Sequence, residues 1–283
     1  MSKQVQWYPG HMFKAKKEIE AKLKIIDLVV EIIDARVPLS SHNDMLTDIT
    51  KRKKRLIVMS KADMVETNEL NKFVTFYKDQ GTEVVLTNLT KVQESKKVLK
   101  KIEQVTQKIK DKHASKGVNK VIRILVMGMP NVGKSTFINY MLMSKKTNTG
   151  NKPGVTKQQQ WVSLSKDLEL LDTPGILVPK IEDIQTGYNL VLCSLIKEEV
   201  VPKDDVSVYL INKLLKEHPK ALDLRYNIKV TDHSDIESIY NLIGRSIGAL
   251  LKGNEVDYER VTNTLINDFR NLNFGKIILD NIK

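Results

Sequence analysis

The sequence contains one cysteine, Cys193, among its 283 residues. A single cysteine excludes an internal disulfide and a cysteine-rich zinc site, and it fits a reducing compartment such as the cytoplasm. Long hydrophobic runs are also missing, because charged residues interrupt apolar stretches such as 25–33 and 121–129. Since a membrane-spanning helix needs about 20 apolar residues, we expect a soluble protein without a membrane span. The first residues have no apolar core after Lys3, so we expect no signal peptide.

What the sequence has in excess is positive charge, with a net charge of +12 and a pI near 9.5. Residues 180–283 hold 14 Lys+Arg and 16 Asp+Glu, whereas residues 1–179 hold 32 Lys+Arg and 18 Asp+Glu. The positive charge is therefore concentrated in residues 1–179. Two segments carry most of the excess: the unbroken basic run 51–55, and the stretch 91–123 with 11 basic and 3 acidic residues. A lysine-rich solvated helix face would explain this pattern. A surface for the phosphate backbone of a nucleic acid explains it too and is the interpretation we favour.

Alternating β-rich runs and amphipathic patterns predict an α/β fold with a mostly parallel sheet up to about residue 178. The predicted strands are 28–33, 56–59, 83–87, 121–127, 160–164 and 168–171. The predicted helices in this part are 43–52, 66–80, 93–113 and one from Lys134. After Gly175 only helices are expected, at 185–197, 204–218, 233–251 and 257–271. The predicted domains are therefore 1–178, with an amino-terminal arm at 1–24, and a small all-helical domain at 179–283.

A phosphate-binding loop is the most specific motif in the chain. Residues 128–135 read GMPNVGKS and match GxxxxGK[ST] in full, between a predicted strand and a predicted helix. Such a loop turns backbone N–H groups toward phosphates at a helix amino terminus. Lys134 is expected to reach the β- and γ-phosphates, and the Ser135 hydroxyl to bind Mg²⁺. The predicted contacts with nucleotide are Asn131, Val132, Gly133, Lys134, Ser135 and Thr136.

Two downstream motifs complete a triphosphate site. The sequence DTPG at 172–175 ends a predicted strand, so that Asp172 can address Mg²⁺ through water and the Gly175 N–H can contact the γ-phosphate. Between this motif and the phosphate loop lies KPGVT at 152–156, whose Thr156 can complete the metal shell. The predicted Mg²⁺ ligands are therefore Ser135, Thr156 and Asp172.

The base-recognition motif comes before the phosphate loop. The tetrapeptide SKAD at 60–63 follows the predicted strand 56–59. The Asp63 carboxylate can accept hydrogen bonds from the N1 and N2 donors of guanine, which adenine lacks, and this gives steep discrimination. Thr87 and Asn88 follow the next strand and are expected to form the supporting loop behind the base. The predicted ligand is GTP or GDP, bound by Ser60, Lys61, Asp63, Thr87 and Asn88, with the motifs in circularly permuted order.

This order of motifs, together with WYPGHM at 7–12 and DARVP at 34–38, resembles the circularly permuted GTPases of the YlqF/RbgA family, the bacterial ribosome biogenesis GTPase A proteins. The resemblance covers nearly the whole chain, to a Gly-Lys-aliphatic tail at 275–279. It implies a GTP-hydrolysing switch that contacts the large (50S) ribosomal subunit precursor and its rRNA during late assembly. We also expect a cytoplasmic monomer.

Ser60 departs from the family pattern, which has asparagine at this position. A serine hydroxyl is expected to be too short to bridge the base and the phosphate loop. We therefore expect nucleotide binding to be weaker by about 1 kcal/mol, and Ser60→Asn to strengthen it, while Asp63 still enforces guanine.

Hydrolysis must proceed without the glutamine that orients water in Ras-like enzymes, because Ile176 follows the DTPG motif. The resemblance points to His11 as the catalytic residue beside Lys134, since neutral imidazole can position a water. A surface or RNA-contacting role of His11 in a flexible arm is the alternative. The resemblance also implies that Asn131 helps to bind K⁺ beside the phosphates, and a loop-shaping asparagine is the alternative there.

Three functions compete. The first is a GTPase switch on pre-ribosomal particles, and the second is a GTP-regulated RNA-binding module with incidental hydrolysis. The third is a P-loop ATPase acting on nucleic acid, against which Asp63 and the lack of helicase motifs speak. Stimulation of turnover by large subunits separates the first two, and nucleotide preference disposes of the third.

Overall fold

The structure is a computed structural model that describes residues 5–6, 17, 19–143, 160–172, 180–181, 183–231 and 234–282. The chain divides into two compact units. The larger unit holds the described residues of 4–181 together with those of 278–283, and the smaller unit spans 182–277. No described helix is long and apolar enough to cross a membrane.

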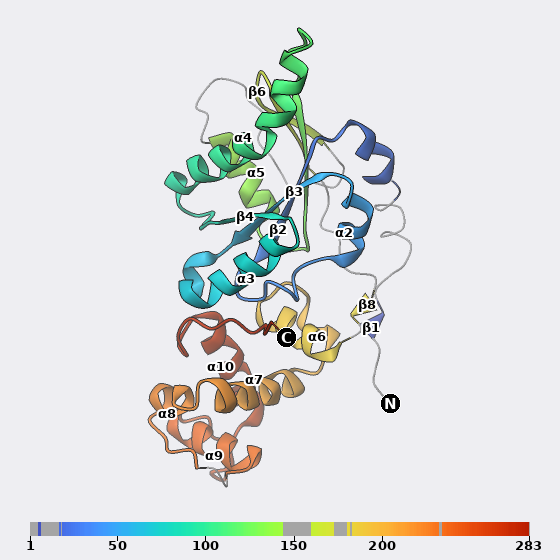
Figure 1. The fold of residues 1–283 in the computed structure, drawn as a ribbon. Coiled ribbons are helices and arrows are strands. Elements are labelled where there is room, and N and C mark those ends of the chain that lie inside the picture. Colours follow the sequence, from blue (N-terminus) through green and yellow to red (C-terminus); the bar gives the residue numbers. More distant parts are fainter. Residues whose placement is uncertain are drawn as a thin grey trace. The chain divides into compact units, whose positions relative to one another are not determined.

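The larger unit is built on a six-stranded sheet in the order β4-β3-β2-β5-β7-β6 (Figure 1). Its strands are β2 (Leu28–Asp34), β3 (Lys54–Ser60), β4 (Glu83–Leu86), β5 (Ile122–Met127), β6 (Gln160–Ser165) and β7 (Leu168–Asp172). All neighbours pair in parallel except β6 and β7, which pair antiparallel. The central strand β2 is buried along its whole length, as expected for a parallel strand covered on both faces. The fold class predicted from the sequence, α/β with a mostly parallel sheet, is confirmed.

Helices cover both faces of this sheet. They are α2 (Asp44–Thr50), α3 (Thr67–Asp79), α4 (Val92–Ala114) and α5 (Lys134–Met143). One apolar cluster packs Phe73 of α3 against Ile33 and Ile57. A second cluster packs Ile19 and Leu46 against β2, β5 and β7. Figure 1 shows α4 and α5 on the opposite side of the sheet from α2. Ile19 belongs to the predicted arm 1–24, so the described end of that arm is part of the core.

The smaller unit is helical. It contains α6 (Ile184–Leu192), α7 (Lys203–Glu217), α8 (Ala221–Tyr226), α9 (Ile236–Ser246) and α10 (Tyr258–Arg270). Arg270 ties α10 to α6, because its guanidinium donates to the carbonyl oxygens of Val191 and Leu192. A buried carboxylate, Asp268, accepts hydrogen bonds from Arg225 of α8.

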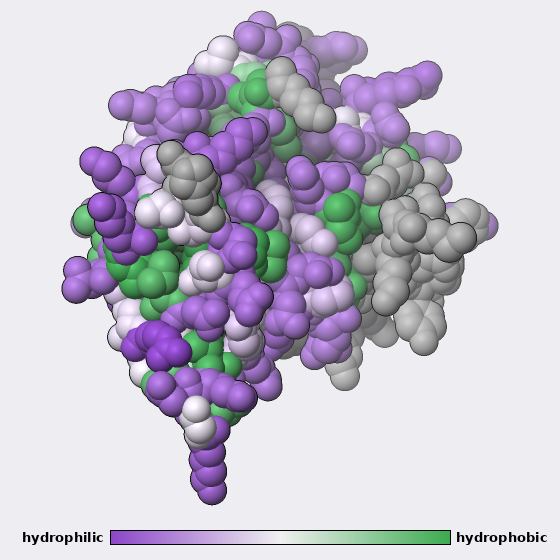
Figure 2. Space-filling view, turned by 90° about the horizontal axis from the view of Figure 1, so that it is seen from below, coloured by the Kyte–Doolittle hydropathy of each residue, from purple (hydrophilic) through white to green (hydrophobic). Residues whose placement is uncertain are grey.

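In the view from below, hydrophilic side chains cover much of the visible surface and apolar ones form separate patches (Figure 2).

Three elements differ from the expectation of helices only after residue 175. A two-residue strand, β8 (Lys180–Ile181), pairs antiparallel with β1 (Val5–Gln6). An isolated antiparallel bridge joins Leu250 and Val256. The predicted helix 233–251 is shorter in the structure and ends at Ser246. Gly248, two residues later, adopts a positive φ of 66°, which does not continue a helix. Strands of two residues carry no alternating pattern, so sequence periodicity does not reveal them.

Candidate nucleotide-binding site

The phosphate loop follows β5 directly and leads into α5. Gly128 has a φ of 149°, and a Cβ there would lie 2.4 Å from the backbone oxygen of Ile32. Gly133 has a φ of 104°, and a Cβ there would lie 3.1 Å from a methyl group of Leu89. Both positions therefore favour glycine, since other residues are strained at these angles, and Gly128 in addition has no space for a side chain. The loop is held between the end of β2 and the segment after β4.

The residues after Gly133 present the chemistry expected of a phosphate site. Lys134 is almost fully buried, and its ammonium donates to the carbonyl oxygen of Met129 at 2.5 Å. Ser135 and Thr136 are exposed on the first turn of α5, where N–H groups and the helix dipole favour an anion. Phosphate oxygens would compete with Met129 for the Lys134 ammonium. This arrangement can bind a nucleotide's phosphate chain.

Asn131 sits in the same loop with a φ of 58°. Asparagine is one of the few residues other than glycine that occupy this left-handed region readily. The loop-shaping interpretation of Asn131 therefore has a structural basis. The expected K⁺ contact of Asn131 stays a prediction.

The base motif lies at the end of β3, beside the phosphate loop. Lys61 adopts a left-handed backbone with a φ of 56°, a conformation that costs about 1–3 kcal/mol in a residue that is not glycine. Its ammonium lies 2.6 Å from the carboxylate of Asp34 at the end of β2. Arg36 donates three hydrogen bonds to the same carboxylate, one from its backbone and two from its guanidinium. Asp34 thus holds Lys61 in a strained position.

The Asp34 carboxylate is inaccessible to solvent and is stabilised as an anion. Burial raises its pKa, but the hydrogen bonds and charge of Arg36 and the charge of Lys61 outweigh burial and hold the pKa below its ordinary value. A buried carboxylate with two cationic partners is kept ionised at neutral pH. The cluster of Asp34, Arg36 and Lys61 is called the DAR cluster below.

Asp63 and the segment after β4 form the other part of the predicted base site. Asp63 is exposed, and it has no hydrogen bond or ion pair with the described residues, so its carboxylate is available to a ligand. Asn88 stabilises its own turn, since its side-chain oxygen accepts hydrogen bonds from Thr90. The Thr87 hydroxyl is buried and has no hydrogen-bond partner among the described residues. The backbone amide of Ala62 donates to Thr87 O at 3.3 Å, which links the two segments.

Ser60 contacts the phosphate loop directly. Its hydroxyl lies 2.7 Å from the carbonyl oxygen of Val132 in the phosphate loop and 2.9 Å from that of Ile33. A hydroxyl has one hydrogen to donate, so it serves these two acceptors in turn. The hydroxyl therefore reaches the phosphate loop, which is one side of the expected bridge, and the expectation that it is too short to reach the base as well stays a prediction. The loop lies close enough because Gly128 lets it approach the end of β2.

Among the predicted metal ligands, Ser135 and Asp172 lie at the same edge of the sheet. Asp172 is the last residue of β7 and pairs in register with Val126 of β5, two residues before the phosphate loop. The side chain of Asp172, and Thr156 and Gly175 in full, lie outside the described residues. Hydroxyl and carboxylate oxygens are the hard ligands that Mg²⁺ prefers, so the residues present fit this ion.

His11 also lies outside the described residues, and its role stays a prediction. The structure does describe the strands that flank the two relevant motifs. β1 precedes the WYPGHM motif and β8 follows the DTPG motif, and Val5 pairs with Ile181. The two motifs are therefore connected to one small ribbon.

Sequence reasoning missed a contact between the carboxyl-terminal residues and this site. Residues 278–282, here called the tail, follow the segment after α10. The Asp280 carboxylate accepts hydrogen bonds from the backbone amides of Leu39 and Ser40, at 2.6 and 2.8 Å, and from the Ser40 hydroxyl. The Leu279 amide donates to Arg36 O at 2.8 Å. The tail thus fastens the loop that follows the DAR cluster, and no local pattern signals a partner about 240 residues away.

Comparisons with known proteins agree with this geometry. A family model described as "50S ribosome-binding GTPase" matches residues 123–240. The chain is 39% identical over 274 residues to Ribosome biogenesis GTPase A of Bacillus licheniformis, covering 96% of each protein. A GDP-bound structure of YlqF has a TM-score of 0.68 at 24% identity, covering 93% of this chain and 98% of that one. A GNP-bound structure of YlqF from T. maritima has a TM-score of 0.64 at 25% identity, covering 94% and 97%.

Proposed function

Because the chain belongs to the ribosome biogenesis GTPase A family, we propose that it is a GTP-hydrolysing switch that binds precursors of the large ribosomal subunit and promotes their late assembly. The relatives that place it in this family share nearly the full length of the chain. The observation that carries the proposal is the phosphate loop of 128–135, fastened by Ser60 to the strand that ends in the base motif.

The exposed carboxylate of Asp63 supports preference for guanine. Adenine offers no donor at the positions of guanine N1 and N2, so a carboxylate placed against the base would lose two hydrogen bonds on binding adenine. A site built to bond a donor rejects an analogue that lacks it by several orders of magnitude. Lys61, held by Asp34, fixes the backbone from which Asp63 projects.

The order of elements supports a circular permutation. The base motif follows β3 and the supporting loop follows β4, and both precede β5 and the phosphate loop along the chain. The matching family model begins at residue 123, inside β5, so the base motif lies outside the matched segment. A circular permutation accounts for this order, because the base motif, the supporting loop and the phosphate loop follow neighbouring parallel strands and lie at one edge of the sheet.

For hydrolysis, we assign Lys134 to the phosphates and His11 to the attacking water. The paired strands β1 and β8 support the role of His11. His11 is five residues past β1 and Gly175 five residues before β8, and five residues extend at most about 17 Å. His11 and Gly175 therefore lie within this distance of one ribbon, which supports a shared γ-phosphate as their target. A neutral imidazole there would orient the water and accept its proton.

Ser135, Thr156 and Asp172 would hold Mg²⁺, which when bound neutralises charge on the phosphate oxygens. Asn131 would contribute to a K⁺ site beside the same phosphates. The chain's own groups contribute the inward-facing amides of the loop and the Lys134 ammonium, which stabilise negative charge as it shifts toward the leaving oxygen.

Nucleotide titrations test the base assignment. We expect the full-length protein to bind GDP and not ADP by calorimetry, and Asp63→Ala to lose on the order of a hundredfold in GDP affinity. Asp48→Ala is the matched control, because Asp48 is also exposed and lies on α2, away from the motif. Equal affinity of the wild type for GDP and ADP would overturn the guanine site.

A further inference from the structure

A cleft of the larger unit lies at the beginning of β3 and β4, away from the phosphate loop. Its volume is about 660 Å³. Basic residues dominate its walls. They are Lys51, Arg52, Lys53, Lys54, Arg55 and Lys108. Glu83 is the one acidic residue among the described residues that line it.

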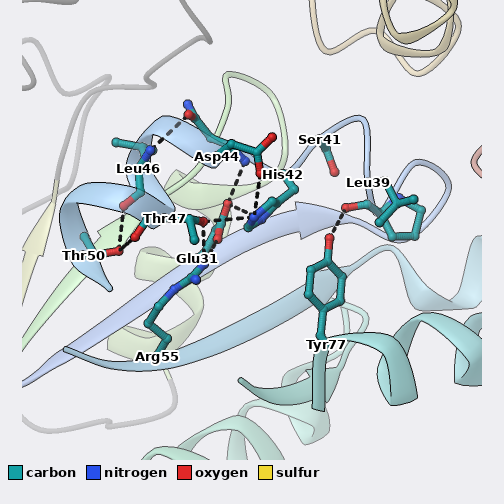
Figure 3. Close-up of polar contacts among 12 residues, drawn as sticks. Glu31, Leu39, Ser41, His42, Asp44, Leu46, Thr47, Thr50, Arg55 and Tyr77 are labelled. Carbon is teal, nitrogen blue, oxygen red and sulfur yellow. Dashed lines mark hydrogen bonds and ion pairs between the residues drawn. The ribbon is translucent and has the colours of Figure 1, made fainter. Parts of the chain in front are cut away.

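Arg55, which lines the cleft, belongs to a buried polar network. Arg55 reaches from β3 to the buried carboxylate of Glu31 at 2.8 Å, and it also donates to the Thr47 hydroxyl at 2.9 Å (Figure 3). His42 lies 3.0 Å from the same carboxylate. Burial raises the pKa of Glu31, but the charges of His42 and Arg55 hold it below its ordinary value. The Arg55 guanidinium is therefore already paired with the Glu31 carboxylate.

Several cations around the rim of the cleft have no counter-ion among the described residues. Lys51, Arg52, Lys54 and Lys108 are exposed and form no ion pair with the described residues. Glu83 offsets them only in part, because Lys101 binds its carboxylate at 2.6 Å and the charge of Lys54 acts on it from farther away. The pKa of Glu83 is accordingly lowered, first by the hydrogen bond from Lys101. The rim thus carries positive charge in excess over its own anions.

A second cavity of about 300 Å³ continues this surface along α4 and the edge strand β4. Gln104 lines both cavities. Lys97, Lys101, Gln104 and Lys108 are spaced by three or four residues and share one face of α4. From Lys97 to Lys108 this face is about 16 Å long at the helical rise. Lys97 and Lys108 therefore place positive charge at the two ends of this face, with the ion-paired Lys101 between them.

We propose that this surface, the 51–54 segment facing the lysine row of α4, binds the phosphate backbone of RNA. A small anion is held best by donors that converge and are buried, whereas these cations are exposed and spread along an open groove. Repeated phosphates at regular spacing match such a row, and backbone contacts by lysine are how proteins hold RNA without reading sequence. The inference deepens the proposed function, on which it rests, by locating an RNA contact on the GTPase unit.

The position of the groove makes it separable from the nucleotide site. Lys54 begins β3 and Ser60 ends it, so the two sites lie about 20 Å apart at the rise of a strand. An RNA phosphate at the rim does not compete with nucleotide. Charge removal at the rim should leave GDP binding intact.

Fluorescence anisotropy with a labelled RNA hairpin of about 20 base pairs, long enough to span a duplex-binding surface, tests this inference. The variant Lys51→Gln, Lys54→Gln and Lys108→Gln should lose tenfold or more in RNA affinity. Three lost phosphate contacts should also lower the slope of log Kd against log salt by roughly 2–3. Arginine at the same three positions should keep the binding.

The matched control removes the same charge from the smaller unit: Lys216→Gln, Lys220→Gln and Lys252→Gln, all at exposed positions. This control should bind RNA within twofold of wild type, and both variants should bind GDP normally. Equal RNA affinity of the two triple variants would overturn the inference, as would displacement of RNA by low-millimolar inorganic phosphate, which would indicate a small-anion site. Loss of GDP binding in the wild type would instead refute the proposed function and leave the RNA result to be judged separately.

Discussion

Asp280 offers a sharp test of how the tail supports the nucleotide site. Its side chain is 8% exposed and accepts hydrogen bonds from both backbone amides at Leu39 and Ser40 and from the Ser40 hydroxyl. These donors belong to the loop that connects the DAR cluster to α2. The substitution Asp280→Ala removes all of these bonds while leaving the tail's apolar contacts.

The magnitude follows from the number and type of these bonds. A hydrogen bond to a charged group contributes about 1.5–3 kcal/mol. The values for one carboxylate do not add, because its donors partly rehydrate once it is removed. We expect Asp280→Ala to lower the free energy of unfolding of the larger unit by about 3 kcal/mol. Asp280→Asn, which keeps one acceptor oxygen but adds an amide donor, should lie between wild type and Asp280→Ala.

Urea unfolding followed by tryptophan fluorescence measures this change. The chain's two tryptophans are Trp7 and Trp161, and Trp161 lies on β6 of the larger unit, so the smaller unit contributes no signal. Asp48→Ala is the control. A change below about 0.5 kcal/mol, the range of ordinary surface substitutions, would refute the role of the tail.

Ser60→Ala should weaken GDP binding about fivefold, since one hydrogen bond to the Val132 carbonyl contributes about 1 kcal/mol. Calorimetry that finds no change in GDP affinity would show that this hydrogen bond does not contribute to binding. Acid should destabilise the fold through Asp34, whose lowered pKa contributes stability that is present above about pH 4 and lost as the pH falls through the folded-state value. Urea midpoints of Asp34→Asn should therefore vary less with pH below 4 than those of wild type, and parallel curves would contradict this. Replacing K⁺ with Na⁺ should lower GTP turnover, and Asn131→Gly, which keeps access to the left-handed backbone, should lose that difference; equal rates in both salts would remove the K⁺ site.

The sheet and most of its helices were predictable because β2 to β5 are apolar runs rich in β-branched residues and helices such as α3 and α4 have an apolar stripe. β2 to β7 lie where the sequence predicted them, within two residues at each end. The phosphate loop was predictable for a different reason, since its glycines are required by contacts such as that of Gly128 with Ile32 O. Apolar patterns and glycines at fixed spacing lie within short segments, so a single sequence reveals them.

The supporting contacts were not predictable, because they depend on distances between segments. Asp34 and Lys61 belong to motifs singled out in the sequence, yet their ion pair follows only from the parallel pairing of β2 with β3. The contact of Ser60 with Val132 was hidden for the same reason, as its reach depends on how closely Gly128 lets the loop approach. Asp280 carries no local signal at all.

The most direct test of the central claim is GTP turnover in potassium buffer with and without purified large ribosomal subunits, for the wild type and for His11→Ala. The account predicts strong stimulation by the subunits, and its loss in His11→Ala while cosedimentation with the subunits is retained. Turnover of the wild type that the subunits leave unchanged would contradict the ribosomal switch. Stimulation that persists in His11→Ala would contradict the assignment of the catalytic histidine.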